Sequence, residues 1–170
     1  MKRVHSPKSV VLPNLSVTVP VLILALLVGF LQPSPVYAES LPARCENDGD
    51  FSSTLEQDAT WSGEVYIGQD LTVRLQSGTD IPSTLTIEPG TTVYFCGEYD
   101  LNIGGLFNPG RLVVNGTEEN PVVFKPATGA TAWGTLAFID TADEPSIVRH
   151  AEFYNGGGVD DTADNATIWI

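Results

Sequence analysis

Hydrophobic residues are distributed along the 170-residue chain in two different ways. Near the N-terminus they form one nearly unbroken run over residues 19–31, whereas from Trp61 onward they form short runs rich in β-branched side chains. Gly, Pro, Asn or Asp separates these short runs, and no helical period of useful length is present. A long apolar run near the start predicts a targeting segment, and short runs between turn residues predict strands.

The first 38 residues have the order of a secretory signal peptide. Basic residues precede the apolar run, and small residues stand at Val36 and Ala38, three and one positions before the expected cut. The thirteen residues of the run fall short of the roughly 20 that a membrane-spanning helix needs. We therefore expect cleavage between Ala38 and Glu39, no membrane span in the mature chain, and a secreted or cell-surface location.

The short runs predict an all-β fold. The expected strands cover residues 71–73, 85–87, 93–95, 112–114, 122–124, 133–139 and 147–153. Three of these end on a phenylalanine, and Phe95, Phe124 and Phe153 follow one another at an equal spacing of 29 residues. Equal spacing of a strand signature indicates stacked coils rather than a sandwich, with the three rings in one interior column.

Three segments carry a family pattern. They are LTIEPGTTV (residues 85–93), LVVNGTEENPVVF (112–124) and WGTLAF (133–138). These segments closely resemble the coils of secreted bacterial right-handed parallel β-helix proteins, and the resemblance covers residues 61–158. It implies a short right-handed parallel β-helix, or solenoid. It implies no single activity, because adhesins, envelope proteins and polysaccharide-degrading enzymes all carry such coils.

We expect three parts: a signal peptide over residues 1–38, a linker or N-terminal cap over 39–60, and β-helix coils over 61–170. Residues 166–170 look like the middle of a further strand, so we expect the solenoid to be incomplete at its C-terminal end. An uncovered coil edge can pair with another chain, which makes self-association through that edge one expectation.

Cys45 and Cys96 are the two cysteines of the chain, and both lie after the leader. An even number in an exported protein favours a disulfide, which would staple the cap onto the coils. A zinc or thiol-chemistry site is the alternative, but His150 is the one histidine that remains after the leader. Such a site normally needs more ligands.

The formal net charge is −13 at pH 7. Removal of the leader deletes three of the eight basic residues and none of the 21 acidic ones, so the mature chain is more acidic still. Such a chain repels polyanions, which excludes nucleic acid as a partner held by phosphate contacts.

No catalytic residue can be assigned from the sequence. Polysaccharide lyases of this fold pair clustered aspartates with Arg or Lys, and the basic residues here stand in no recognisable motif. Glycosidases of this fold need paired carboxylates. Candidates for such a pair are Asp140, Asp143, Glu144, Glu152, Asp160, Asp161 and Asp164. We interpret most of them as solvated turn residues. His150 takes a slot where related coils carry a stacked ring, which favours a structural role.

Calcium is the one cofactor that the sequence suggests, because oxygen-rich clusters suit this cation. The candidate ligands are Asp48, Asp50, Asp160, Asp161 and Asp164. Neither cluster has the spacing of a 12-residue calcium loop. Trp61 and Trp133 have two interpretations, as platforms on which sugars stack or as packing between coils, and their positions just ahead of strands favour packing.

These observations favour a secreted or cell-surface β-helix that acts as a non-catalytic binding or structural module. Its expected partners are polysaccharides, cell-envelope components or other copies of the chain. The alternative is the N-terminal fragment of a polysaccharide lyase or glycoside hydrolase whose active site lies outside this sequence.

Overall fold

The structure is a computed structural model that describes residues 41–46, 49–158 and 167–170. All described residues belong to one compact unit within Ala38–Ile170. The predicted signal peptide and its cleavage site between Ala38 and Glu39 lie outside the described residues.

The described residues form three parallel sheets and one short 3-10 helix, η1 (Ala43–Cys45). The first sheet contains β1 (Thr54–Leu55), β4 (Leu71–Val73), β7 (Leu101–Ile103), β10 (Leu136–Phe138) and β13 (Ile168–Trp169). The second sheet contains β2 (Ala59–Trp61), β5 (Thr84–Ile87), β8 (Arg111–Asn115) and β11 (Ile147–Arg149). The third sheet contains β3 (Glu64–Ile67), β6 (Thr92–Phe95), β9 (Val122–Pro126) and β12 (Ala151–Phe153).

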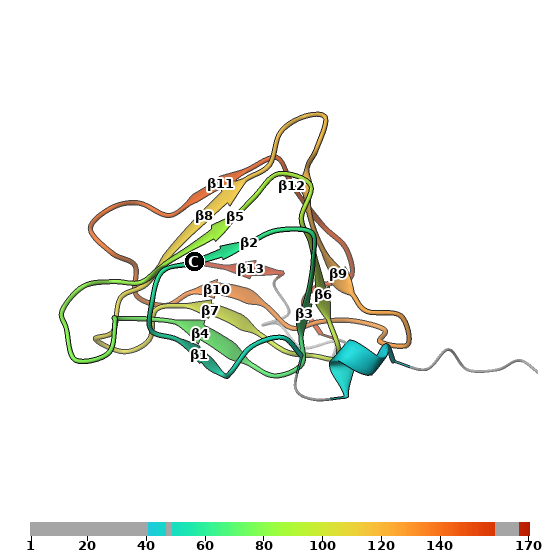
Figure 1. The fold of residues 1–170 in the computed structure, drawn as a ribbon, viewed down its shortest axis with the longest axis horizontal. Coiled ribbons are helices and arrows are strands. Elements are labelled where there is room, and N and C mark those ends of the chain that lie inside the picture. The colour runs from blue at the N-terminus through green and yellow to red at the C-terminus, as the bar shows by residue number, and fades with distance from the viewer. Residues whose placement is uncertain (1–40, 47–48, 159–166) are drawn as a thin grey trace, which may run out of the picture. The chain divides into compact units, whose positions relative to one another are not determined.

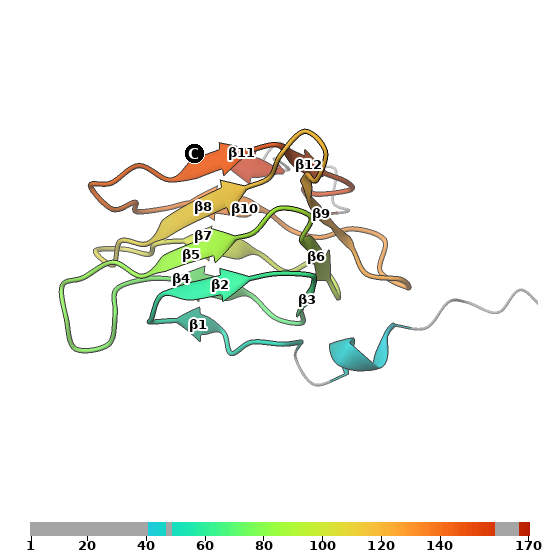
Figure 2. The same ribbon diagram turned by 45° about the horizontal axis from the view of Figure 1, so that its top comes forward.

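The chain visits the three sheets in turn, and each strand pairs in parallel with the equivalent strand of the previous coil. Figure 1 looks along the stack, with one sheet on each of three sides, and Figure 2 shows the strands of successive coils above one another. The predicted all-β parallel β-solenoid is confirmed, with about three turns. None of the described helices is long and apolar enough to cross a membrane.

The core lies between the three sheets and consists of columns of identical or similar side chains. Leu71, Leu101 and Leu136 stand at one register position of the first sheet, and all three are almost completely buried. Leu85 and Leu112 form the matching pair in the second sheet. Each fully buried side chain of this size contributes about 1.5–3 kcal/mol, so repeated apolar positions hold the coils together.

Aromatic rings form a second part of the core. Phe95 stacks on Trp133 at 4.3 Å between ring centroids, and Phe124 stacks on Phe153 at 4.9 Å. The indole N–H of Trp133 donates to the carbonyl of Tyr154 at 2.9 Å, so this buried ring has its polar group satisfied. Trp133 therefore packs between coils, as its position ahead of a strand favoured.

The predicted alignment of the three phenylalanines is half wrong. Phe153 pairs with Phe124 as expected, but Phe124 pairs with Val93, and Phe95 pairs with Pro126. Partners in β5 and β8 are 27 residues apart, as in Leu85 and Leu112, whereas partners in β6 and β9 are 31 apart, as in Val93 and Phe124. The phenylalanine spacing of 29 therefore misses the register of the third sheet by two residues. Because side chains alternate between faces with a period of two, Phe124 still points inward and the shift is invisible in the hydrophobic pattern.

Two further differences concern the ends of strands. The predicted strand 147–153 is two strands, β11 and β12, separated by His150 with φ 45°. His150 is exposed at this corner, so the expected stacked position is wrong, and the ring that stacks is Phe153. The first coil also begins earlier than Trp61, because β1 and the start of β2 precede it.

Candidate functional site

Three loops from successive coils meet at the corner between the first and second sheets. They connect β4 to β5 (residues 74–83), β7 to β8 (104–110) and β10 to β11 (139–146). The corner is at the left of Figure 1, where these connections project from the sheets. Backbone hydrogen bonds join two of the loops. The N–H of Gly110 donates to the carbonyl of Asp140 at 3.1 Å, and the N–H of Ala142 donates to the carbonyl of Gly110 at 3.0 Å. We call residues 80–84, 105–111 and 139–144 the corner surface.

The β4–β5 loop folds into a small hairpin that places Ile81 in solvent. The backbone N–H of Gln76 donates to the carbonyl of Ile81 at 2.8 Å, and the hydroxyl of Thr79 accepts from the N–H of Ile81 at 3.1 Å. The loop is thus held by its own hydrogen bonds, although the side chain of Ile81 is 57% exposed. A loop fixed in this way presents its apolar side chain at little cost in conformational entropy.

The β7–β8 loop presents a second apolar group at the tip of a two-residue turn. Gly105 and Asn108 exchange two backbone hydrogen bonds, of 3.0 and 2.9 Å. Leu106 and Phe107 between them are 77% and 84% exposed. Phe107 also has φ 58°, a left-handed conformation that is rare for a bulky residue. Strain and exposure of a large ring at one position mark a candidate contact residue.

A groove with a volume of about 530 Å³ runs between these loops. Its charged lining residues are Asp80, Arg111, Asp140, Asp143 and Glu144. Ile81, Pro82 and Pro109 supply apolar lining beside them. The groove is therefore an acidic, partly apolar depression with one guanidinium group.

Arg111 is held in place by groups from the neighbouring coil. Its side chain pairs with Glu144 at 2.8 Å, and its Nε donates to the carbonyl of Pro145 at 3.3 Å. Its guanidinium group is thereby fixed within the groove, and the carboxylates of the other lining residues carry the negative charge. The guanidinium group and the carboxylates can form hydrogen bonds with hydroxyl or amino groups of a ligand. The apolar side chains that line the groove suit the C–H faces of sugar rings.

The structure brings together some of the carboxylates that the sequence suggested as a catalytic pair. Asp140, Asp143 and Glu144 line the groove, whereas Glu152 lies on the third sheet and accepts a hydrogen bond from the hydroxyl of Tyr154 at 2.8 Å. This hydrogen bond and the negative charge of Glu152 raise the pKa of Tyr154. Asp160, Asp161 and Asp164 lie outside the described residues.

The calcium candidates are divided in the same way. Asp50 is engaged by Arg44 and by the backbone N–H of Tyr66, which donates to it at 2.8 Å. Asp48, Asp160, Asp161 and Asp164 lie outside the described residues. Over residues 41–46, 49–158 and 167–170, no group of three or more His, Cys, Asp or Glu side chains is arranged to hold a metal ion.

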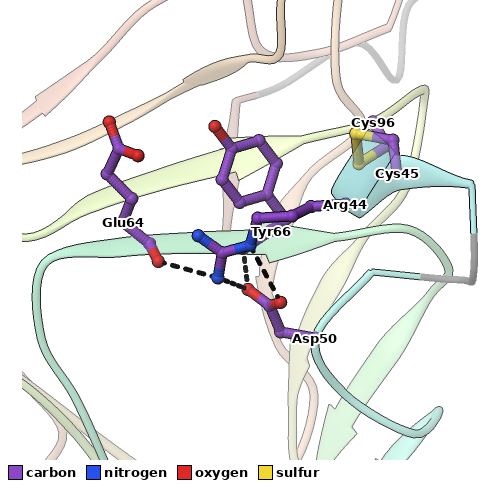
Figure 3. Close-up of polar contacts among 6 residues, drawn as sticks. All are labelled: Arg44, Cys45, Asp50, Glu64, Tyr66 and Cys96. Carbon is purple, nitrogen blue, oxygen red and sulfur yellow. Dashed lines mark hydrogen bonds and ion pairs between the residues drawn. A yellow bond between two sulfur atoms is a disulfide. The ribbon is translucent and has the colours of Figure 1, made fainter. Parts of the chain in front are cut away.

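A second polar cluster lies at the N-terminal end of the third sheet (Figure 3). The predicted disulfide joins Cys45 to Cys96, with 5.5 Å between the Cα atoms. It places Arg44 over the ring of Tyr66, with 4.4 Å from Cζ to the ring centroid. Arg44 also pairs with Asp50 and donates to the carbonyl of Glu64 at 3.1 Å. The disulfide thus anchors a cation–π contact and an ion pair.

Tyr66 begins a column of stacked groups on the outer face of this sheet. Its ring lies 4.8 Å from that of Tyr94, and Lys125 covers the other face of Tyr94 at 5.0 Å. Burial, followed by the charge of Glu64, raises the pKa of both tyrosines. Because both ring faces of each tyrosine are covered, this column is not a free platform for stacking sugars. Trp61 is also buried, so packing within the coils, and not sugar binding, describes its position.

Sequence analysis missed the apolar members of the corner surface. Ile81, Leu106 and Phe107 stand in polar, turn-rich segments, where an isolated apolar residue is common and carries no signal of its own. The Gly-Gly and Asn-Pro pairs around Leu106 and Phe107 mark a tight turn, and a large ring inside such a turn was the available signal.

No protein-family model matches the chain, and neither the curated proteins nor the solved structures contain a significant match to it.

Proposed function

We propose that the protein is a secreted or cell-surface, non-catalytic binding module of the bacterial β-helix type, and that its corner surface binds a polysaccharide. The observation that carries the proposal is the concentration of exposed apolar side chains on this one corner. Four of the large hydrophobic residues with high exposure lie there: Ile81, Leu106, Phe107 and Ile139. Exposed apolar groups that gather beside a polar groove are typical of a contact surface.

The chemistry of the groove supports a neutral or amino-bearing polysaccharide as the ligand. Its carboxylates accept hydrogen bonds from hydroxyl and ammonium groups, and Arg111 donates to ring or hydroxyl oxygens. Polymers of uronic acids would be repelled by the same carboxylates and by the net charge of −13. A solenoid suits an extended ligand, because equivalent loops of successive coils lie along one line.

The proposal is tested by retention on insoluble polysaccharides. Cellulose represents neutral polymers, chitosan amino-bearing ones and calcium pectate the uronic class. We expect retention on cellulose or chitosan and none on pectate, with Phe107→Asn and Ile81→Ser each reducing retention at least about fivefold, the loss expected when one contact residue is removed. Ile170→Ser is the matched control, because Ile170 is 95% exposed but lies outside the corner surface.

Two results would overturn the proposal. One is equal retention of the wild type and both corner variants. The other is release of soluble sugars from the polymer, which would favour the rival function, a fragment of a lyase or glycoside hydrolase. The groove does contain Arg111 beside carboxylates, so the supernatants should be assayed for reducing ends and for unsaturated products.

A further inference from the structure

A second groove continues the corner surface toward the N-terminal coils. Its volume is about 250 Å³, and it is lined by Glu56, Arg74, residues 75–79 and Asn108. We call it the second groove, and the groove that contains Arg111 the first groove. Residues 74–79 are the outgoing half of the β4–β5 hairpin, and residues 80–82 of the returning half line the first groove. The two grooves therefore lie on either side of one hairpin.

The order of the coils places the two grooves one after the other along the solenoid axis. The second groove is lined by residues that follow β1, β4 and β7, and the first groove by residues that follow β4, β7 and β10. Figure 2 shows the loops after β4, β7 and β10 one above another at the left of the stack. An extended ligand that lies along this corner would therefore meet both grooves.

Each groove contains an ion pair between an arginine and a glutamate of the neighbouring coil. In the second groove, Nε of Arg74 donates to the carboxylate of Glu56 at 3.0 Å. In the first groove, Arg111 pairs with Glu144 at 2.8 Å. All four side chains are accessible, from 24% exposed for Arg111 to 76% for Glu144. An arginine beside a carboxylate offers hydrogen-bond donors and acceptors side by side, and the vicinal hydroxyl groups of a sugar require both.

Backbone hydrogen bonds fix the two arginines relative to each other. The N–H of Ser83 donates to the carbonyl of Arg74 at 3.1 Å, and the N–H of Arg111 donates to the carbonyl of Ser83 at 3.0 Å. Leu75 and Pro82 form an antiparallel bridge at the base of the hairpin. The separation of the two ion pairs is thus set before a ligand arrives, which lowers the entropic cost of binding one molecule to both.

This separation matches the repeat of an extended β-1,4-linked polysaccharide. One ion pair lies between the coils of β1 and β4, and the other lies between the coils of β7 and β10. Two coil steps of about 4.8 Å, roughly 10 Å along the axis, therefore separate them. One disaccharide unit of an extended β-1,4-linked chain has about this length. Because neighbouring rings of such a chain alternate in orientation, its successive disaccharides present the same face to successive ion pairs.

We propose that the first and second grooves bind one β-1,4-linked chain together, with Arg74 and Glu56 as a second set of contact residues. This specificity rests on the polysaccharide binding proposed above. A disaccharide fills the first groove, which the exposed side chains of Ile81 and Phe107 flank, whereas a longer chain also reaches Arg74. Since both grooves then hold one molecule, affinity rises steeply with chain length.

Isothermal titration calorimetry with oligosaccharides of defined length tests the proposal. The probes are the disaccharide and the hexasaccharide of cellulose and of chitosan. We expect the hexasaccharide of the retained polymer to bind at least about tenfold more tightly than its disaccharide, as for two linked binding events. Maltohexaose, which has the same length but α-1,4 links, should bind no more tightly than the disaccharide, because its chain curves and does not follow the axis.

Substitution of Arg74 separates the contributions of the two grooves. Arg74→Gln should reduce the affinity for the hexasaccharide at least about fivefold and leave the affinity for the disaccharide unchanged, whereas Arg111→Gln should weaken the binding of both. Arg149→Gln is the matched control, because Arg149 is exposed on β11 and lines neither groove. Should Arg74→Gln fail to fold, Glu56→Gln provides the second test, with the same expected pattern.

The outcomes separate this proposal from polysaccharide binding as such. Equal affinities of the wild type for the disaccharide and the hexasaccharide would overturn the two-groove site and leave binding at the corner surface intact. The same holds for an unchanged hexasaccharide affinity in a folded Arg74→Gln or Glu56→Gln variant, and for maltohexaose that binds as tightly as the β-1,4-linked hexasaccharide. Failure of the wild type to bind any of these oligosaccharides would overturn both proposals.

Discussion

Asp70 accepts a hydrogen bond from the backbone N–H of Asp100 in the next coil, at 3.0 Å. Asp100 in turn accepts from the backbone N–H of Thr135 in the coil after that, at 2.7 Å. Each of the three residues precedes an inward-facing leucine of the first sheet. The two aspartates therefore satisfy backbone donors at a corner where the sheet has not yet begun, and they fix the start of the strands that follow.

Two substitutions of Asp100 should distinguish the contribution of its hydrogen bond to stability from the contribution of its charge. Asp100→Ala removes the acceptor of the Thr135 N–H, and we expect a loss of about 1–3 kcal/mol in the free energy of unfolding. Asp100→Asn keeps an oxygen acceptor and removes the charge, so its stability at pH 7 should equal or exceed that of the wild type. Chemical denaturation of both variants measures the difference.

The same residue predicts a pH dependence. Burial, partly offset by the hydrogen bond from Thr135, raises the pKa of Asp100 above its ordinary value of 3.8. The folded state therefore holds this proton more tightly than the unfolded state, and its contribution to stability is fully present below pH 3.8 and is lost as the pH rises through the folded pKa. The stability of the wild type relative to Asp100→Asn should fall over this interval. A constant difference between the two proteins would show that burial does not perturb Asp100.

Gly116 should be required for the close approach of two coils. A Cβ at this position would lie 2.1 Å from the carbonyl oxygen of His150, a backbone atom that cannot move independently. We expect Gly116→Ala to cost at least about 2 kcal/mol, as for other overpacking substitutions. Gly105→Ala is the matched control, since a Cβ there meets nothing within 4 Å. Equal melting temperatures for the two variants would contradict the observed spacing.

The disulfide should contribute substantially to stability. Cys45 and Cys96 are 51 residues apart, and closing a loop of this length lowers the entropy of the unfolded chain by an amount worth about 4 kcal/mol. The oxidised protein should therefore unfold at a higher temperature or denaturant concentration than the Cys45→Ser/Cys96→Ser variant. If the two midpoints coincide, the segment that contains Cys45 is not coupled to the folding of the coils.

Phe107 is expected to lower the stability of the fold through its left-handed backbone and to strengthen polysaccharide binding through its exposed ring. Its φ of 58° is more easily adopted by Asn than by Phe. Phe107→Asn should therefore leave the free energy of unfolding unchanged or raise it by up to about 1 kcal/mol, while polysaccharide retention falls. A variant that is clearly destabilised would indicate that Phe107 supports the fold and is not a contact residue.

The sequence was sufficient to predict the fold because the inward positions repeat. The Leu-x-Val and Leu-x-Ile signatures identified β4, β5 and β8 nearly to the residue, and the cysteine count predicted the disulfide. Leu101-Asn102-Ile103 carries the same signature and forms β7, so this strand could also have been predicted. The error lay in the alignment of coils, because a register shift of two residues leaves the hydrophobic alternation unchanged.

The corner surface was less accessible to sequence analysis. Asp140, Asp143 and Glu144 were recognised as carboxylates in a turn, but Asp80 joins them from a loop about 60 residues earlier, through the stacking of coils. The exposure of Ile81 and Phe107 depends on how each loop folds back on itself. Neither property is visible without knowing which positions of successive coils lie side by side.

The corner surface is proposed to hold a sugar polymer without cleaving it. The most direct test of this binding is an NMR titration. Backbone amide chemical shifts are recorded while soluble oligosaccharides of the retained polymer are added. With a disaccharide, we predict shift changes confined to residues 80–84, 105–111 and 139–144, with the oligosaccharide recovered intact. Shift changes confined to the outer faces of the sheets, or shortened oligosaccharides after incubation, would contradict it.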